Sequence, residues 1–231
     1  MLHCIENDSE GGESTLCDGF KAAADLARYD PQSFKLLALR SFVFTWQGKQ
    51  GVYLKARKPI IQAYLEHLRM LEDAVHTGQW PTVKGADIFS MNPENSTDTW
   101  NDPNTAAYAA IAPALQAIHL DNRNMSTSAI YDSPLEEGKA LMQAYARFVR
   151  LIENKQSELA FKLAPGEVLL FNNRRCLHGR REFDPSTGSR HLEGCYMDSD
   201  LMFSTYQATH AKVFGSVTDT RFDRPDPSIA R

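Results

Sequence analysis

The sequence predicts a mainly β fold with flanking helices, and three observations support this prediction. Residues 159–163 (LAFKL) alternate apolar and polar side chains, which is typical of a half-buried strand. A Pro-Gly turn separates them from residues 167–171 (EVLLF), an apolar run that suits an inner strand. Two further apolar runs, 42–46 and 52–54, flank a segment bounded by glycines and predict a hairpin.

Helices are expected before and between these strands. Asp18 can cap a helix over residues 19–29, which is rich in alanine. Pro31 stands where the first turn of a second helix tolerates proline. Apolar residues spaced three or four apart at 141–152 predict a third helix before the core strands.

The middle of the chain is interpreted as an insertion, residues 59–117, made of helices and a polar loop. Helical spacing predicts a helix over residues 62–76, with Tyr64, Leu68 and Leu71 turned inward. A second helical stripe is predicted at 108–118. The insertion is expected to pack on the outside of the core, and the alternative is a lid or partner surface.

The end of the chain predicts a closing helix over residues 197–214, capped by Asp198 or Ser199. Residues 216–231 hold several aspartates and prolines and are expected to be a disordered tail. Residues 1–215 then form one domain.

Composition excludes several classes of function. The 231 residues are 42% hydrophobic and carry a net charge of -4, which suits a globular core and gives no support for nucleic-acid binding. The pairs Arg174-Arg175 and Arg180-Arg181 are too short for a basic patch, and no apolar run predicts a membrane span. Four cysteines without C-x-x-C spacing indicate reduced thiols. A cytoplasmic protein is expected, with a mitochondrial location as the alternative.

Four stretches carry a resemblance to a known family. They are residues 177–181 (LHGRR), 189–194 (SRHLEG), 2–7 (LHCIEN) with 11–14 (GGES), and 118–123 (IHLDNR). In their order along the chain they resemble the C-terminal part of the gamma-butyrobetaine dioxygenase and trimethyllysine dioxygenase family, which is TauD/TfdA-like.

The resemblance implies a double-stranded β-helix, or jelly-roll, oxygenase core, here incomplete and carrying the insertion. It also implies Fe(II), 2-oxoglutarate and O2, with ascorbate left open as a further cofactor. The implied activity is a gamma-butyrobetaine hydroxylase-like dioxygenase of carnitine biosynthesis, acting on a trimethylammonium carboxylate such as gamma-butyrobetaine. Residues 189–194 look more like the butyrobetaine branch than the trimethyllysine branch. A homodimer is left open.

Five site residues are carried over from the resemblance. His178 corresponds to the distal iron ligand, and Arg190 to the residue that binds the distal carboxylate of 2-oxoglutarate. Ser14 corresponds to a hydroxyl that donates to the same carboxylate. Asn122 and Tyr196 correspond to residues that line the substrate pocket.

The sequence departs from the family at the metal site. The family holds iron with two histidines and one carboxylate, and its His-x-Asp pair lies just before the segment with which Met1 begins here. His119 and Asp121 form another His-x-Asp, but the resemblance places them in the middle of the core, in the wrong order. We therefore expect His178 to be the one remaining ligand and this chain to bind Fe(II) weakly, without hydroxylating gamma-butyrobetaine.

Two alternatives stay open. One is a truncated, catalytically inactive relative that acts as a binding or structural protein, and the other is a trimethyllysine dioxygenase-like enzyme. The fold prediction is specific: residues 159–163, 167–172 and 190–196 should be neighbouring strands of one sheet. His178 and Arg190 should point into the same cavity.

Overall fold

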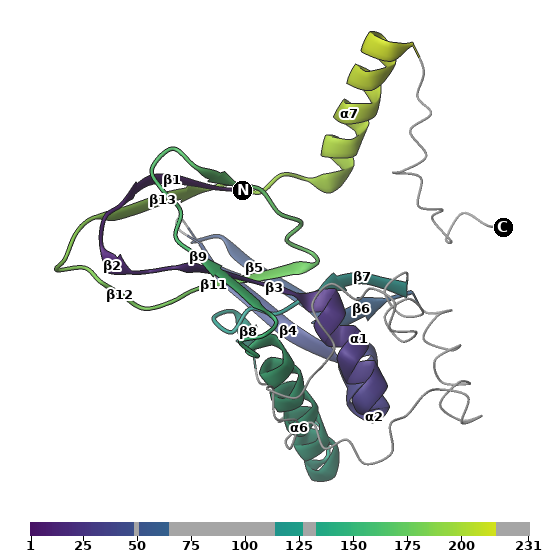
Figure 1. Ribbon diagram of the computed structural model, residues 1–231. Coiled ribbons are helices and arrows are strands. Elements are labelled where there is room, and N and C mark those ends of the chain that lie inside the picture. The colour runs from purple at the N-terminus through teal and green to yellow at the C-terminus, as the bar shows by residue number, and fades with distance from the viewer. Residues whose placement is uncertain (49–50, 65–113, 127–132, 216–231) are drawn as a thin grey trace.

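The computed structural model describes residues 1–48, 51–64, 114–126 and 133–215 (Figure 1). Its described strands are β1 (Leu2–Asn7), β2 (Glu10–Gly11), β3 (Ser14–Asp18), β4 (Ser41–Gln47), β5 (Tyr53–Pro59), β6 (Ile61–Ala63), β7 (Leu115–Ile118), β8 (Met125–Ser126), β9 (Glu158–Phe161), β10 (Val168–Leu169), β11 (Cys176–Arg180), β12 (Phe183–Asp184) and β13 (Arg190–Gly194). Its described helices are α1 (Gly19–Tyr29), α2 (Pro31–Leu39), α6 (Leu135–Ile152) and α7 (Ser199–Phe214).

Segments from opposite ends of the sequence pair as successive parts of one antiparallel ribbon. β3 pairs with β11, β2 with β12 and β1 with β13, so that Ser14 lies opposite Arg180 and Asn7 opposite Arg190. The ribbon turns back at β2 and β12, on the left of Figure 1, and brings β1 and β13 above β3 and β11. Gly11 and Gly12 take φ of 74° and 75° at this bend, a conformation that glycine adopts without steric cost.

The edges of this ribbon are extended by one strand at each end. β9 adds to β3, and β10 adds to β1 on the edge opposite β13. The prediction that residues 159–163, 167–172 and 190–196 are neighbouring strands of one sheet is therefore wrong. β9 pairs with β3 in another sheet, and β1 lies between β10 and β13, because alternation fixes the face of a side chain and leaves the pairing partner open.

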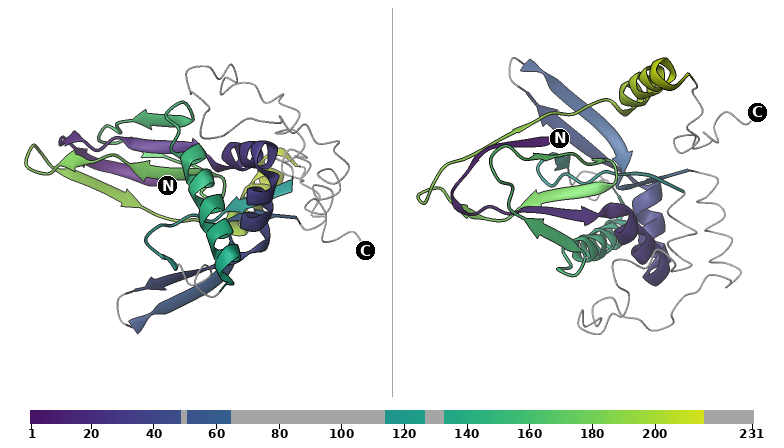
Figure 2. Two further views of the ribbon diagram at one scale, coloured as in Figure 1. Left: turned by 90° about the horizontal axis from the view of Figure 1, so that it is seen from below. Right: turned by 45° about the horizontal axis from the view of Figure 1, so that its top comes forward.

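The hydrophobic core lies on the helical side of the molecule, where α1, α2 and α6 pack with β4, β6 and β7. Phe42 and Phe148 are fully buried there. The predicted helices at 19–29, after Pro31 and at 141–152 are confirmed. The β4–β5 hairpin is confirmed as well, and it projects from the body in both views of Figure 2.

The ends of the predicted insertion are core strands, which corrects the expectation for residues 59–117. Ile61 pairs with Ile118, so the predicted helices are wrong where β6 and β7 stand. Ile61 and Leu115 are 0% and 1% exposed. Periodicity does not separate a short buried strand from a helix. The remaining part of the insertion, including Leu68 and Leu71, lies outside the described residues.

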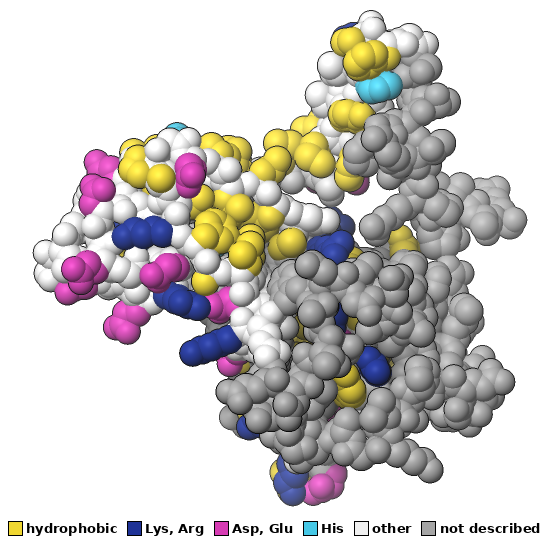
Figure 3. Space-filling model, in the orientation of Figure 1, with side chains coloured by type: hydrophobic (Ala, Val, Ile, Leu, Met, Phe, Trp, Pro, Cys, Tyr) yellow, Lys and Arg dark blue, Asp and Glu magenta, His cyan; other side chains and the backbone are white. Residues whose placement is uncertain are grey.

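α7 follows β13 and confirms the predicted closing helix. Asp198 caps it, accepting from the backbone N–H groups of residues 200 and 201, and Gly215 ends it in the left-handed conformation. None of its residues is buried, and hydrophobic side chains gather where the β1–β13 sheet leads into it (Figure 3). The predicted tail at 216–231 lies outside the described residues.

The described part of the chain is thus strand-rich with several helices, and its strands do not close into a barrel. Among its helices, none is both long enough and apolar enough to cross a membrane.

Candidate functional site: a carboxylate site on the inner face of the ribbon

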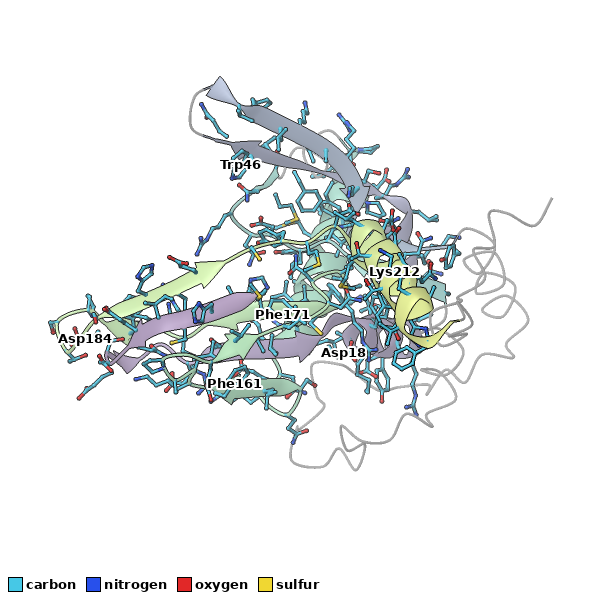
Figure 4. The ribbon with its side chains drawn as sticks, turned by 90° about the horizontal axis from the view of Figure 1, so that it is seen from above. Asp18, Trp46, Phe161, Phe171, Asp184 and Lys212 are labelled. Carbon is cyan, nitrogen blue, oxygen red and sulfur yellow. The ribbon has the colours of Figure 1, made fainter. Side chains whose placement is uncertain are left out.

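The strand β11 presents different residues to its two faces. Leu177 packs against the helical core, so the alternation along a strand turns His178 and Arg180 to the opposite face. The ring of His178 lies 5.0 Å from the ring of Phe171, centroid to centroid. Figure 4 labels Phe171 in the middle of the ribbon and Asp18 at its inner end, where β3 meets α1.

His178 is suited to hold a metal as a neutral imidazole. The residue as a whole is exposed, but its ring is partly shielded from water. This shielding, and then the positive charge of the Met1 ammonium, lower the pKa of His178 below its ordinary value. The imidazole is therefore uncharged at neutral pH and has a lone pair free for a cation.

The sheet of β10, β1 and β13 also buries polar groups. Cys4 and Asn7 are 0% and 7% exposed on β1, and both reach the carbonyl oxygen of Leu163. The Asn7 Nδ2 donates to it at 2.7 Å. Arg190 stands opposite Asn7 in the register and is close enough to Cys4 for its charge to act on the thiol. The Arg190 side chain therefore lies close to the buried side chains of β1.

Arg190 holds a buried hydrogen-bond donor without an acceptor. Its Nε has no partner within the described residues, and the same is true of Asn7 Oδ1 and Ser9 Oγ. Gly12 makes the room for this side chain, because a Cβ at residue 12 would lie 3.2 Å from Nε. Buried polar groups in proteins are normally paired, so an unpaired guanidinium N–H at this place fits a bound anion.

Ser14 supplies a hydroxyl near the same place. It is 6% exposed and stands directly opposite Arg180 in the β3–β11 pairing. Directly opposed residues of an antiparallel pair project from the same face. Burial and then the positive charge of Arg180 lower the pKa of Arg190, which places the second guanidinium nearby. The combination of guanidinium and hydroxyl donors suits a carboxylate.

The described residues do not complete an iron site. None of their histidine, cysteine, aspartate and glutamate side chains form a group of three or more that could hold a metal. The role of His178 as an iron ligand therefore stays a prediction that rests on the resemblance.

The His-x-Asp at 119–121 is engaged elsewhere. His119 follows β7, and its Nε2 lies 2.8 Å from Gln62 Oε1. Burial, and then the charges of Lys58 and Arg174, lower the pKa of His119 to about 4. Asp121 accepts hydrogen bonds from the backbone N–H of Arg123 and from the side chain of the next residue. His119 thus contacts β6, and Asp121 stabilises the turn that follows β7.

The two predicted substrate residues lie in different surroundings. Residues 119–123 were expected to continue a central strand, and the structure instead ends β7 at Ile118 and forms a turn. In that turn Asn122 Oδ1 accepts a 2.6 Å hydrogen bond from Tyr145 of α6. Tyr196 is 84% exposed between β13 and α7. Their contact with a substrate stays a prediction.

An open hollow of about 510 Å³ at the tip of the ribbon is lined by Glu10, Gly11, Glu182, Phe183, Asp184 and Pro185. Figure 4 labels Asp184 at this tip. Three of the six lining residues are acidic, which disfavours an anion. The hollow therefore suits a carboxylate less well than the surroundings of Arg190 do.

The sequence analysis missed Arg180, Phe183 and Gly12. Arg180 was assigned to a short surface pair with Arg181, although its even spacing from His178 was a signal that both share a face. Nothing in the local sequence of Phe183 or Gly12 predicts their contact with Arg190. Gly12 meets Arg190 only because β2 pairs with β12, more than 150 residues further along the chain.

The bent β-ribbon carries an imidazole on β11 and, on β13, a guanidinium with an unpaired buried N–H. The chain belongs to the taurine catabolism dioxygenase TauD, TfdA family, which matches residues 1–196.

The sequence identity to individual members of the family is low. The chain is 28% identical to gamma-butyrobetaine dioxygenase of Homo sapiens over 214 residues, which are 92% of this chain and 43% of that protein. It is 26% identical to gamma-butyrobetaine dioxygenase of Pseudomonas sp. (strain AK-1), covering 88% of the chain and 40% of the relative. It is 25% identical to mitochondrial trimethyllysine dioxygenase of Bos taurus, covering 89% and 38%. The chain therefore spans about two fifths of the length of these curated relatives.

Proposed function

We propose that this chain forms the part of an Fe(II)- and 2-oxoglutarate-dependent dioxygenase that holds the co-substrate and contributes one iron ligand. Family membership supports the reaction class. The unpaired, buried Nε of Arg190 is the observation that carries the proposal, because it marks a place for a carboxylate. The jelly-roll core of the family is the fold that this ribbon would complete.

Each residue then has a defined task. Arg190 binds and orients the distal carboxylate, and Ser14 donates a hydrogen bond to it. His178 offers an uncharged imidazole to the metal. Iron bound with 2-oxoglutarate would supply the oxidising chemistry, which belongs to the cofactor. The substrate proposed is a trimethylammonium carboxylate such as gamma-butyrobetaine.

The test separates co-substrate binding from turnover. Under anaerobic conditions 2-oxoglutarate is titrated calorimetrically into the chain, with and without Fe(II). Arg190→Ala should weaken 2-oxoglutarate binding about 10- to 100-fold, the usual range for a lost charge-assisted hydrogen bond. His178→Ala should abolish any gain that Fe(II) gives and leave binding without metal unchanged. A wild-type chain that does not bind 2-oxoglutarate, or binds it independently of Arg190, would refute the proposal.

Turnover is measured as succinate release with gamma-butyrobetaine and, separately, with trimethyllysine. More succinate with gamma-butyrobetaine supports the proposed substrate, and the reverse ratio assigns the site to trimethyllysine. Because the described residues hold only one family ligand, we expect little turnover by this chain alone. Strong coupled turnover that is lost in His119→Ala would show that His119 binds the metal, against its contact with Gln62.

A further inference from the structure

Arg180 lies in the proposed carboxylate site and so far has no assigned role. It is two residues beyond His178 on β11, with its side chain on the same face, and it stands opposite Ser14. The residue is exposed, so its guanidinium has the freedom to meet a ligand.

One aromatic ring carries both guanidinium groups. The Cζ of Arg180 lies 4.6 Å from the ring centroid of Phe183, and that of Arg190 lies 5.7 Å from the same centroid. Each contact is a cation–π interaction, and the shared ring keeps two like charges close together. A pair of positive charges held in this way repel each other unless an anion lies between them.

Two neighbouring arginines form ion pairs with carboxylates of this chain. Arg181 pairs with Glu158 at 2.5 Å, and Arg175 pairs with Asp18 at 2.5 Å. Within the described ranges no hydrogen bond or ion pair joins Arg180 or Arg190 to a carboxylate. Unlike Arg181 and Arg175, the two arginines on Phe183 are therefore available to an outside anion.

We propose that Arg180 is a second, direct ligand of the carboxylate that Arg190 binds, so that the site binds 2-oxo dicarboxylic acids more tightly than 2-oxo monocarboxylic acids. Contact with the Phe183 ring keeps both guanidiniums near one place, and Ser14 completes the donor set. This inference rests on the proposed function, because it assigns a further residue to the same site. The proposed function needs only Arg190 to bind the carboxylate, whereas this inference requires Arg180 as well for tight binding.

The experiment compares two probes and five forms of the full chain. The probes are 2-oxoglutarate and 2-oxobutyrate, which share the 2-oxo acid end and differ in the distal carboxylate. The forms are wild type, Arg180→Ala, Arg180→Lys, Arg190→Ala and the matched control Arg181→Ala, which removes an adjacent arginine that already has a carboxylate partner. Affinities are measured by calorimetry, and circular dichroism checks that each variant is folded.

Arg180→Ala is expected to weaken 2-oxoglutarate binding about 10-fold or more and to leave 2-oxobutyrate binding unchanged. Arg180→Lys should restore part of the affinity, because it keeps the charge and loses the fork. Arg181→Ala should bind as wild type does. If Arg180→Ala and Arg180→Lys both bind 2-oxoglutarate as wild type does while Arg190→Ala fails, the inference about Arg180 is overturned and the proposed function stands. If Arg190→Ala also binds normally, both are overturned.

Discussion

Replacing Gly12 by alanine tests whether the bend of the ribbon shapes the carboxylate site. Gly12 has φ of 75°, and an alanine there takes a left-handed backbone that costs about 1–2 kcal/mol. The new Cβ would also lie 3.1 Å from the Cβ of Phe183 and 3.2 Å from the Nε of Arg190. Both distances are short for carbon contacts, so Phe183 and the guanidinium must move by a few tenths of an ångström.

These two effects appear in different measurements. The backbone cost lowers the free energy of unfolding, which urea denaturation reports. The movement of Arg190 misaligns its donor, and a lost charge-assisted hydrogen bond of about 1.5–3 kcal/mol corresponds to about 10- to 100-fold weaker 2-oxoglutarate binding. Gly166→Ala is the matched control, because Gly166 has φ of 88° and nothing within 4 Å of its would-be Cβ. It should lose similar stability and keep its affinity for 2-oxoglutarate.

If Gly12→Ala and Gly166→Ala both bind 2-oxoglutarate as tightly as wild type does, Arg190 does not bind the carboxylate from its present position. If both lose affinity equally, the cause is general destabilisation, which also contradicts the reasoning. The expected pattern is equal stability loss with unequal affinity.

Two further predictions concern the scaffold. Asp18→Ala should lower the free energy of unfolding by about 1–3 kcal/mol, because it removes the cap of α1 and leaves Arg175 without its carboxylate; Asp18→Asn, which keeps a cap acceptor, should lose less in urea denaturation. His119 should titrate near pH 4 by NMR. Since this histidine takes up its proton near pH 6.5 in the unfolded chain, the free energy of unfolding should fall as the pH drops from 6.5 towards 4. His119→Gln should flatten the pH dependence of the unfolding midpoint, and an unchanged slope would contradict the assignment.

Local features of the fold were predictable because their causes are local. Asp18 and Asp198 cap helices through their own neighbours in sequence, and Pro31 begins α2 because its ring presets the backbone angle. The β4–β5 hairpin pairs adjacent segments, so its apolar runs sufficed to find it. In each case the deciding contacts lie within a few residues.

Pairing over long distances was not predictable from local patterns. β6 and β7 are short, their apolar residues Ile61, Leu115 and Ile118 are buried, and these match helical spacing as well as they match a strand. β9 and β10 were predicted in one sheet from their alternation and from the resemblance, whereas they pair with β3 and β1 in different sheets. Which strand lies beside which is decided by the fold as a whole.

The site shows the same division. The resemblance located His178, Arg190 and Ser14, and their roles remain predictions that the experiments above address. Arg180 was overlooked because its partner ring, Phe183, belongs to the bend that forms only when the two ends of the chain meet. Side chains that share a ring across a bend leave no periodic signal in the sequence.

The ribbon that joins residues near both ends of the described chain has a consequence for how the protein is made. The ammonium of Met1 donates to the carbonyl of Cys195, 194 residues away, and Asn7 bonds Leu163, 156 residues away. Contacts of such high sequence separation form slowly, because the loop between them must close first. During synthesis β1 and β3 cannot pair until the strands β9 to β13 have left the ribosome. Over that interval their open edges invite pairing with other chains, so chaperone supply and low temperature should decide how much of the protein is recovered in folded form.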